Sequence, residues 1–265
     1  MNDLAYNLDD FTWQVSNDRY HIGDVNTESG ELKRAIILSL EGEGLPFNDY
    51  VPQKNPAMFF DFANTDPTEA RVLAFANQYG SLKPKYFNLA KIDADNEPKY
   101  YEEISEWFNE MREMAKVLDF WDSINKKDNE KLSQQIHLES NGYCYTDGFF
   151  KEQYLVRINK KPKDLTNPAL EAVATMIDAA FVRHPIKRSL GHNYVEKCLY
   201  RSPMIKDLIS LLWFQVEEMV VQNRAFRTCA VCKKYFEIKP PVTRKTKIYC
   251  SGACNAAAYR KRKAK

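Results

Sequence analysis

Four cysteines near the end of the chain have the spacing of a metal site. Cys229 and Cys232 form a C-x2-C pair, and Cys250 and Cys254, 17 residues further on, form a C-x3-C pair. Zn²⁺ in structural sites prefers four soft ligands in a tetrahedron, and a tight turn can supply two thiolates at once. Since no histidine follows His192, all four ligands would be sulfur and the ion would keep no open position. The pattern therefore predicts one structural Zn²⁺ and no catalysis by it.

The two other common uses of a C-x2-C motif fit this chain less well. A redox motif lies in a βαβ context and needs no second cysteine pair downstream. Disulfides are typical of exported proteins, and residues 1–5 show neither the basic nor the apolar part of a signal peptide. Cys144 and Cys198, outside the motif, are then expected as free thiols of a cytoplasmic protein.

Two local structures must position the four sulfurs. We expect a knuckle at 229–232 that turns both thiolates inward, and a helix beginning near Ser251 in which Cys250 and Cys254 lie one turn apart on one face. The free N–H groups at the start of that helix would favour the thiolate form. A knuckle, a short two-stranded segment and a ligand-bearing helix together describe a treble-clef finger. We therefore predict a finger over 227–265 and a separate body over 1–226.

The net charge of +2 conceals a strong asymmetry. Residues 227–265 hold 12 Lys and Arg and one acid, Glu237, a net charge of +11, whereas the rest of the chain holds 26 basic and 35 acidic residues, a net charge of −9. A basic segment on an acidic body favours a polyanionic partner for that segment, and docking of the tail on the body is the alternative.

Two basic clusters are the candidate nucleic-acid contacts, since neutralising phosphates supplies most of the non-specific affinity. They consist of Lys239, Arg244, Lys245 and Lys247 between the cysteine pairs, and of Arg260, Lys261, Arg262 and Lys263 after them. The alternative is a solvated tail whose cations suit a helix C-terminus. Phe236, Tyr249 and Tyr259 could stack on bases, but in so small a unit we expect them to cover the zinc site.

The finger resembles that of a known family. Arg227 to Phe236 (RTCAVCKKYF), Tyr249 to Cys254 (YCSGAC) and Ala258 to Arg262 (AYRKR) are similar to the C-terminal finger of bacterial CGNR-type zinc-finger proteins. The segment 75–82 (FANQYGSL) also resembles a motif of their N-terminal domain, although Asn255-Ala-Ala replaces the Gly-Asn-Arg that gives the family its name. The resemblance implies a transcription regulator that binds DNA.

The body is predicted to mix strands and helices. Apolar residues alternate over 13–15 and 20–22 with turn residues between them, which predicts a hairpin, and the run 35–38 fits a buried strand, with a helix as the alternative. Residues 41–58, with five Gly and Pro, are expected to form a loop. A further strand is predicted at 153–158.

Apolar periodicity and capping residues predict five helices in the body. These are 66–80 with Asp66 as N-cap and Gly80 as stop, a long helix from Pro98 to Leu118, 128–137, a helix from Asn167 to Phe181, and a helix from Ser202-Pro203 to Arg224. The last has the widest apolar surface and is expected to be central. Because it ends just before Cys229, we expect the finger to be held against the body.

The best candidates for enzyme chemistry are basic residues after the fourth of these helices. Arg183, His184, Lys187, Arg188 and His192 could bind an anion or donate a proton, but no phosphate loop or nucleophile motif accompanies them. We expect them on a surface loop and predict no enzymatic activity.

The sequence as a whole predicts an α+β protein with a mostly helical body and a four-cysteine finger. The expected function is binding of nucleic acid, DNA above all, in bacterial regulation, with the body sensing a small ligand or mediating association such as a homodimer. The alternative is a protein-interaction module in which zinc only staples the tail. No membrane span is expected, because the most apolar stretch, 208–221, is short and carries charges.

Overall fold

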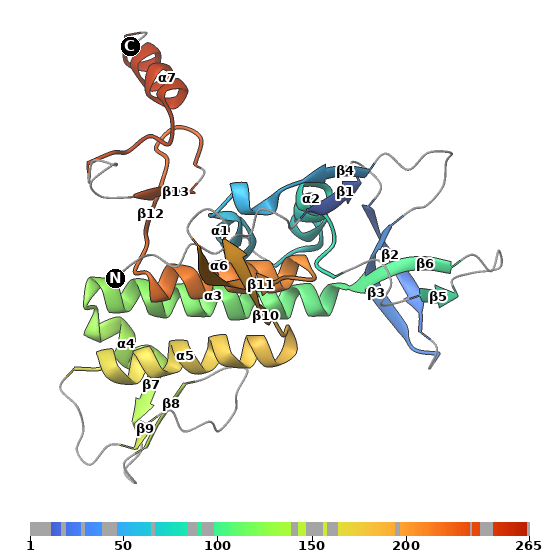
Figure 1. Cartoon of the computed structure of the whole chain (residues 1–265), viewed down its shortest axis with the longest axis horizontal. Helices are drawn as coiled ribbons and strands as arrows, with labels where there is room; N and C mark the ends of the chain where they lie inside the picture. Colours follow the sequence, from blue (N-terminus) through green and yellow to red (C-terminus); the bar gives the residue numbers. More distant parts are fainter. Residues whose placement is uncertain are drawn as a thin grey trace.

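The computed structural model describes residues 12–16, 20–27, 30–38, 47–64, 67–83, 89–91, 98–138, 143–146, 156–157, 164–193, 197–233, 235–238 and 246–263. Helices form the centre of the body, and strands lie around them (Figure 1). No helix among these residues is long and apolar enough to cross a lipid bilayer.

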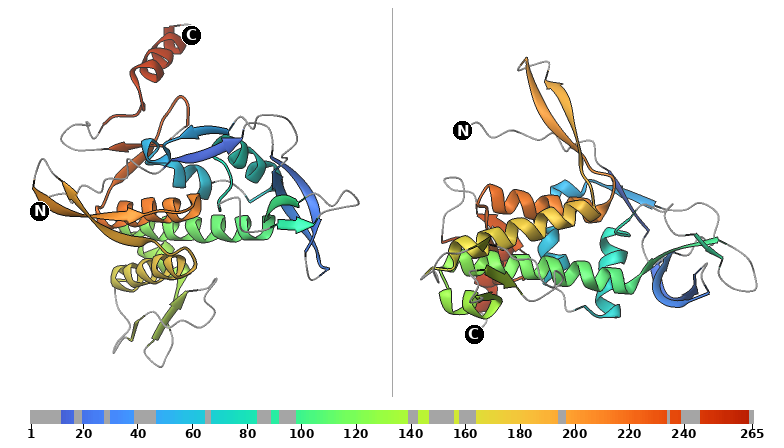
Figure 2. Two further views of the ribbon diagram at one scale, coloured as in Figure 1. Left: turned by 45° about the vertical axis from the view of Figure 1, so that its right-hand side comes forward. Right: turned by 90° about the horizontal axis from the view of Figure 1, so that it is seen from below.

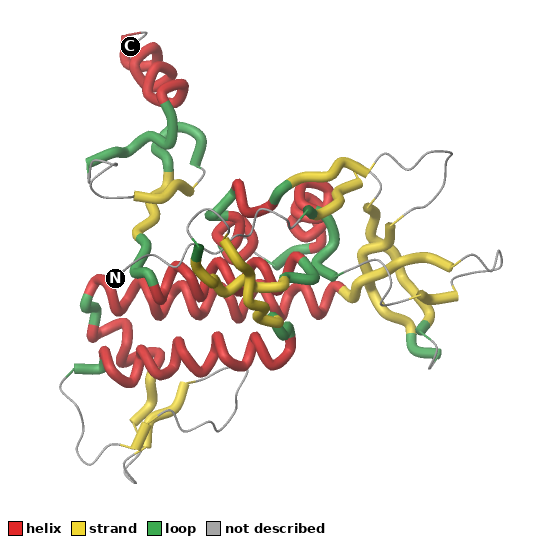
Figure 3. The backbone as a smooth tube through the Cα atoms, viewed as in Figure 1, coloured by secondary structure: helices red, strands yellow, loops and turns green. Residues whose placement is uncertain are grey.

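Three helices, α3, α5 and α6, run beside one another through the body (Figure 3). Their bounds are α3 Ile104–Lys126, α5 Thr166–Arg183 and α6 Leu208–Val221. Shorter helices cover them, namely α1 (Met58–Ala63), α2 (Glu69–Tyr79) and α4 (Asn129–Gln135), and a 3-10 turn, η1, spans Pro52–Lys54. Trp107 of α3 and Trp213 of α6 have no exposed surface. Burial on most sides of α6 confirms its expected central place.

The strands form small antiparallel sheets. At one end of α3, β2 (Tyr20–Asn26), β3 (Leu32–Leu38), β6 (Pro98–Glu103) and β5 (Leu89–Lys91) form a sheet in that order. The other sheets are β1 (Trp13–Ser16) with β4 (Phe47–Tyr50), β7 (Ile136–Leu138) with β8 (Tyr143–Thr146) and β9 (Val156–Arg157), β10 (Lys187–Asn193) with β11 (Cys198–Met204), and β12 (Ala225–Thr228) with β13 (Tyr235–Ile238). The β10–β11 hairpin stands out from the helices (Figure 2, right).

Two strand predictions at the start of the chain need correction. Strand β1 pairs with β4, and β2 pairs with β3, so the strands at 13–16 and 20–26 do not form a hairpin with each other. The expected loop at 41–58 contains β4, η1 and the start of α1, and its residues 41–46 lie outside the described part. Alternation of apolar residues identifies a strand but carries no information on its partner. The predicted strand at 35–38 is confirmed within β3.

The predicted helices exist, but several begin later than expected. Pro98 opens strand β6 and Pro203 lies in β11, whereas α3 begins at Ile104 and α6 follows Asp207, whose carboxylate accepts the backbone N–H of Ser210 at 2.8 Å. Proline marks both the first turn of a helix and the edge of a sheet, so the residue alone does not distinguish them.

The other helix ends agree more closely with the sequence. Helix α2 has Thr68 as its N-cap, and the predicted N-cap Asp66 lies outside the described residues. The helix stops at Gly80, as predicted, but the φ of 91° and ψ of −177° of this glycine are not the αL conformation expected there. Helix α5 is preceded by Leu165 in place of Asn167. Helix α4 (Asn129–Gln135) lies within the predicted 128–137, and only 156–157 of the predicted strand 153–158 are described.

Candidate metal centre

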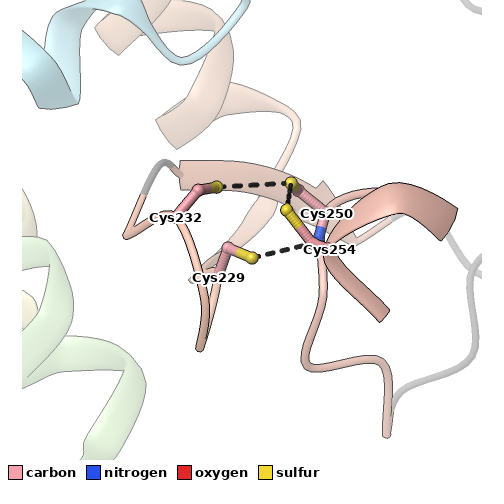
Figure 4. Close-up of side chains that lie close together, drawn as sticks. All are labelled: Cys229, Cys232, Cys250 and Cys254. Atoms are coloured by element: carbon pink, nitrogen blue, oxygen red, sulfur yellow. Dashed lines mark hydrogen bonds between the residues drawn. The ribbon is translucent and has the colours of Figure 1, made fainter. Parts of the chain in front are cut away.

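The four predicted cysteines converge in the structure. All four Sγ atoms lie within 4.8 Å of one another, with Cys250 at 3.5 Å from Cys232 and 3.6 Å from Cys254 (Figure 4). A tetrahedral site with metal–sulfur bonds of about 2.3 Å needs sulfur–sulfur separations of roughly 3.8 Å. The sulfurs are also much further apart than the roughly 2.05 Å of a disulfide, and all four are free thiols. The structure thus supports a four-sulfur metal site and contradicts the disulfide alternative.

The first cysteine pair is held by a tight backbone turn. The N–H of Lys233 donates to the carbonyl oxygen of Cys229 at 3.0 Å, and Lys233 itself has a φ of 63°, which closes the turn. The N–H of Ala230 donates to the carbonyl oxygen of Ile248 at 3.0 Å, which ties the knuckle to the segment that leads into Cys250. The expected knuckle is confirmed, and its backbone fixes the approach of the second pair.

The second cysteine pair lies at the start of helix α7 (Gly252–Lys263). The hydroxyl of Ser251, directly before the helix, accepts the N–H of Cys254 at 3.3 Å, as a helix N-cap does. The helix therefore begins where the sequence predicted, and one turn separates Cys250 from Cys254 so that their sulfurs meet.

The electrostatics of the cluster favour a cation among the sulfurs. Burial opposes ionisation of Cys229, but N–H groups of Cys232, Cys250 and Val231 outweigh it and lower the pKa of Cys229 to about 6. Burial raises the pKa of Cys250 to about 12, and the neighbouring thiols of Cys232 and Cys254 add to the rise. Four negative sulfurs at this separation would repel one another strongly. A thiophilic metal ion removes this repulsion, so the donor set fits a structural metal.

A hairpin joins the metal centre to the body. Tyr235 of β13 stacks on Phe60 of α1 with ring centroids 4.4 Å apart and an angle of 14° between the planes (Figure 1 shows β12, β13 and α1). Phe226 of β12 lies against the same ring at 5.1 Å, and Arg224 pairs with Glu237 at 3.6 Å. The finger is therefore held against the body, as expected, and the hairpin makes that contact.

Helix α7 points away from the body (Figure 1). None of its side chains is buried, and Tyr259 is 53% exposed. The prediction that Tyr259 covers the metal site is therefore wrong, because its position on α7 faces solvent. Phe236 and Tyr249 are half-buried, and the ammonium of Lys247 lies 5.3 Å from the ring of Phe236.

The candidate nucleic-acid contacts divide into two groups. Arg260, Lys261, Arg262 and Lys263 are exposed and occupy the last turn of α7. Of the upstream cluster only Lys247, half-buried, is described, because Lys239, Arg244 and Lys245 lie outside the described residues. The downstream cluster therefore lies on an exposed helix. For the upstream cluster, the structure gives the position of Lys247 alone.

Of the residues considered for enzyme chemistry, His184 alone lies between a helix and a strand, and it is buried. Arg183 ends α5, His184 is 8% exposed, and Lys187, Arg188 and His192 lie in strand β10. Both Arg183 and His184 bind one carboxylate, Glu110 of α3: His184 Nε2 lies 2.9 Å and Arg183 Nε 3.2 Å from its Oε1. Basic residues at the end of a helix are usually exposed, but here Arg183 and His184 turn towards the buried carboxylate of Glu110.

Glu110 was not among the candidate site residues predicted from the sequence. This residue lies three positions after Trp107 and four before Met114, within the apolar stripe of α3, and it is 8% exposed. Burial alone would raise its pKa, but the hydrogen bond and charge of His184, with Arg183 and Trp213, outweigh burial and lower the pKa of Glu110 to about 2. A carboxylate in an apolar stripe is the signal that could have found it.

Cys144 and Cys198 lie in strands β8 and β11, and their side chains fall outside the described part of the structure.

Comparisons with known proteins add no relative: no family model matches the chain, and no curated protein matches it. The resemblance to CGNR-type fingers thus rests on the quoted residues, with the four-cysteine cluster as the structural feature compatible with it.

Proposed function

We propose that the chain is a nucleic-acid-binding protein, with DNA as its target and transcription regulation as its role, whose binding helix is α7. One observation carries the proposal: four consecutive cations, 260–263, end a helix that is anchored at its other end by the cysteine cluster and has no buried side chain. A basic helix held by a metal site and facing solvent suits insertion beside a phosphate backbone.

The charge distribution supports the same function. The finger segment 227–265 carries a net charge of +11 before metal binding, against −9 for the rest of the chain. One Zn²⁺ with four thiolates changes the first figure by about −2, so a strongly positive finger remains. The acidic body would keep nucleic acid away from itself and leave α7 as the favourable point of contact.

The metal is proposed to be Zn²⁺, and the fold of 227–265 a treble clef. The order of knuckle, β13 and ligand-bearing α7 supports this assignment, as does a donor set of four sulfurs. The filled coordination sphere leaves the ion no place for substrate, and we propose no enzymatic role for it.

A second function, a protein-interaction module, is favoured by the apolar surface of the finger. Val231, Ile248 and Tyr259 are 39, 46 and 53% exposed. Such side chains are typical of a small interface with another protein, in which zinc would only staple the tail.

Salt dependence of binding distinguishes the two functions. We expect the zinc-loaded protein to bind random duplex DNA, with log K falling against log salt at a slope of about −4 to −5 if roughly five phosphates are contacted. Replacing Arg260, Lys261, Arg262 and Lys263 with alanine should weaken binding to all sequences about equally and flatten the slope by about 1 for each lost contact. Fluorescence anisotropy over a salt series measures both quantities.

A charge-matched control removes four exposed cations of the body, Lys54, Arg71, Arg112 and Lys126. This variant should keep the wild-type affinity and slope. If the wild type shows no salt-dependent binding to duplex DNA, single-stranded DNA or RNA at low salt, the nucleic-acid function is wrong and the interaction module remains.

A further inference from the structure

The body contains a pocket far along the chain from the finger residues. It has a volume of about 600 Å³ and lies where the first half of α3 meets the end of α5 and the start of α6. This volume is within the range of small-molecule sites. The lining includes Leu82, Trp107, Glu110, His184 and Lys206, which come from four separate segments of the chain.

The wall of the pocket is preformed. Glu102 accepts the backbone N–H groups of Leu82 and Lys83 at 3.0 and 2.6 Å and the indole N–H of Trp107 at 3.0 Å. The N–H of Ile209 in turn donates to the carbonyl oxygen of Leu82 at 3.1 Å. These bonds fasten the segment at 82–83 to both α3 and α6, so a ligand would not have to order it.

The carboxylates of the lining already have partners. Glu102 accepts the three N–H groups just named, Glu106 pairs with Lys83, and Asp207 caps α6. Glu110 accepts from His184, Arg183 and the indole N–H of Trp213, the last at 2.8 Å. None of the four is left to attract a cation, which makes the pocket a poor site for a metal or an amine.

Two cations of the lining have no such partner. Lys187 and Lys206 are exposed, and no carboxylate of the described residues pairs with either of them. In the β10–β11 hairpin Lys187 lies opposite Met204, two residues before Lys206, so both lysines stand at the base of this hairpin. The lining therefore offers two exposed positive charges that no described carboxylate neutralises.

His184 supplies a further polar group. It is more than nine-tenths buried, lines the pocket, and its Nε2 lies 2.9 Å from Glu110. Because an ionised carboxylate that accepts several donors can only accept, Nε2 carries the hydrogen. The other ring atom, Nδ1, has no partner within the described part of the chain and can form a hydrogen bond with a hydroxyl group of a ligand.

We propose that this pocket binds a small organic acid bearing a hydroxyl group, with its anionic group between Lys187 and Lys206 and its hydroxyl on Nδ1 of His184. Pro185 and the aliphatic stems of the lysines cover the carbon skeleton of the ligand. The site lies wholly in the body, so it does not depend on the proposed function of the finger.

Calorimetric titration of the full zinc-loaded chain tests the proposal with four probes. We expect 4-hydroxybenzoate or 4-hydroxyphenyl phosphate to bind at one site per chain, benzoate to bind several-fold more weakly, and neutral 4-hydroxybenzamide not to bind measurably. The better of the first two tells a carboxylate site from a phosphate site. Failure of every anion to bind with a Kd below about 10 mM overturns the proposal.

Variants locate the binding. The double variant Lys187→Gln and Lys206→Gln, at two exposed positions, should weaken binding about tenfold, as expected for two lost charge contacts at a partly exposed site. Asn109→Phe, exposed on α3 in the lining, should also weaken it by filling the pocket. The control Lys54→Gln and Arg71→Gln removes equal charge from exposed positions outside the lining and should leave the binding of these anions unchanged. Equal loss in the control and the pocket variant would assign the anion to general charge attraction and overturn the site.

Discussion

The buried carboxylate of Glu110 makes the stability of the body depend on pH in the acid range. Its pKa is lowered to about 2, so the group contributes stability above its ordinary pKa of about 4.5, and this contribution is lost as the pH falls from about 4.5 towards 2. The contribution is on the order of 3 kcal/mol, because Glu110 is almost fully buried and screening by solvent is small.

The variant Glu110→Gln measures this contribution. At pH 6 it should lower the free energy of unfolding by roughly 2–4 kcal/mol, since Arg183 and His184 lose the charge that they surround. Between pH 5 and pH 3 the variant should lose less stability than the wild type, while loss of metal in acid affects both proteins alike. Urea unfolding followed by circular dichroism gives both values.

Glu106→Gln is the matched control, because Glu106 pairs with Lys83 on the more open side of α3, with 45% of its side chain exposed. It should change the free energy of unfolding by less than about 1 kcal/mol. Equal pH profiles for wild type and Glu110→Gln would show that Glu110 is not ionised in the folded protein.

The four cysteines and Glu110 differ in how far the sequence could reveal them. Metal ligands must occupy one small sphere, so two short spacings were enough to predict all four. The partners of Glu110, by contrast, lie 73 and 74 residues away along the chain. Only the packing of α3 against α5 brings them together, and no local pattern records that packing.

The same contrast holds for helices and strands: local patterns in the sequence located the helices but did not reveal which strands pair. Periodicity located α3, α5 and α6, and Ser251 marked the start of α7. The pairing of β1 with β4 across about thirty residues was missed, since alternation describes a face and not a neighbour. The aromatic contact between α1 and the β12–β13 hairpin was missed as well, because no helix was predicted at 58–63 and the contact joins segments far apart in the chain.

This contact gives a prediction for the hairpin. Phe60→Ala removes the ring on which Tyr235 and Phe226 pack and should destabilise the attachment of the hairpin by about 1–2 kcal/mol. Amide hydrogen exchange in β12 and β13 should become faster, and zinc content should not change, because Phe60 is not one of the four candidate ligands. Exchange followed by mass spectrometry and elemental analysis measure the two effects.

Phe108→Ala serves as the control for a half-buried ring of α3 that packs on the core but not on the hairpin. It should lower the overall stability of the protein. The ratio of the exchange rate in the hairpin to the exchange rate in the body should stay as in the wild type. If Phe60→Ala gives the same pattern as this control, the hairpin is held by its metal end and not by α1.

At the scale of the whole molecule, two parts of the chain are stabilised by different means. The body has a continuous apolar core that includes Trp107, Phe120 and Trp213. Helix α7 buries none of its side chains, and its 12 residues are near the lower limit for an isolated helix in water. Four basic residues in the last turn suit the helix dipole but add only about 1 kcal/mol or less each. We therefore expect the helical structure of α7 to depend mainly on metal binding by Cys250 and Cys254 at its start.

Removal of the metal by a chelator should separate these two parts. We expect the amides of 229–233 and of α7 to lose their protection from hydrogen exchange, because the metal-linked sulfurs are the tether that holds knuckle and helix together. The amides of α3, α5 and α6 should keep their protection, and β12–β13 should keep most of theirs through Phe60. Binding to DNA should fall at the same chelator concentration that releases the metal.

Adding back one equivalent of Zn²⁺ should restore both the protection of α7 and the binding, and Mg²⁺, which prefers oxygen ligands, should restore neither. Protection of α7 that survives complete loss of metal would mean that the helix is ordered by contacts other than the cysteines. A body that unfolds together with the finger would show instead that the two share one cooperative unit, in which the hairpin transmits the loss of the metal through α1 to the core.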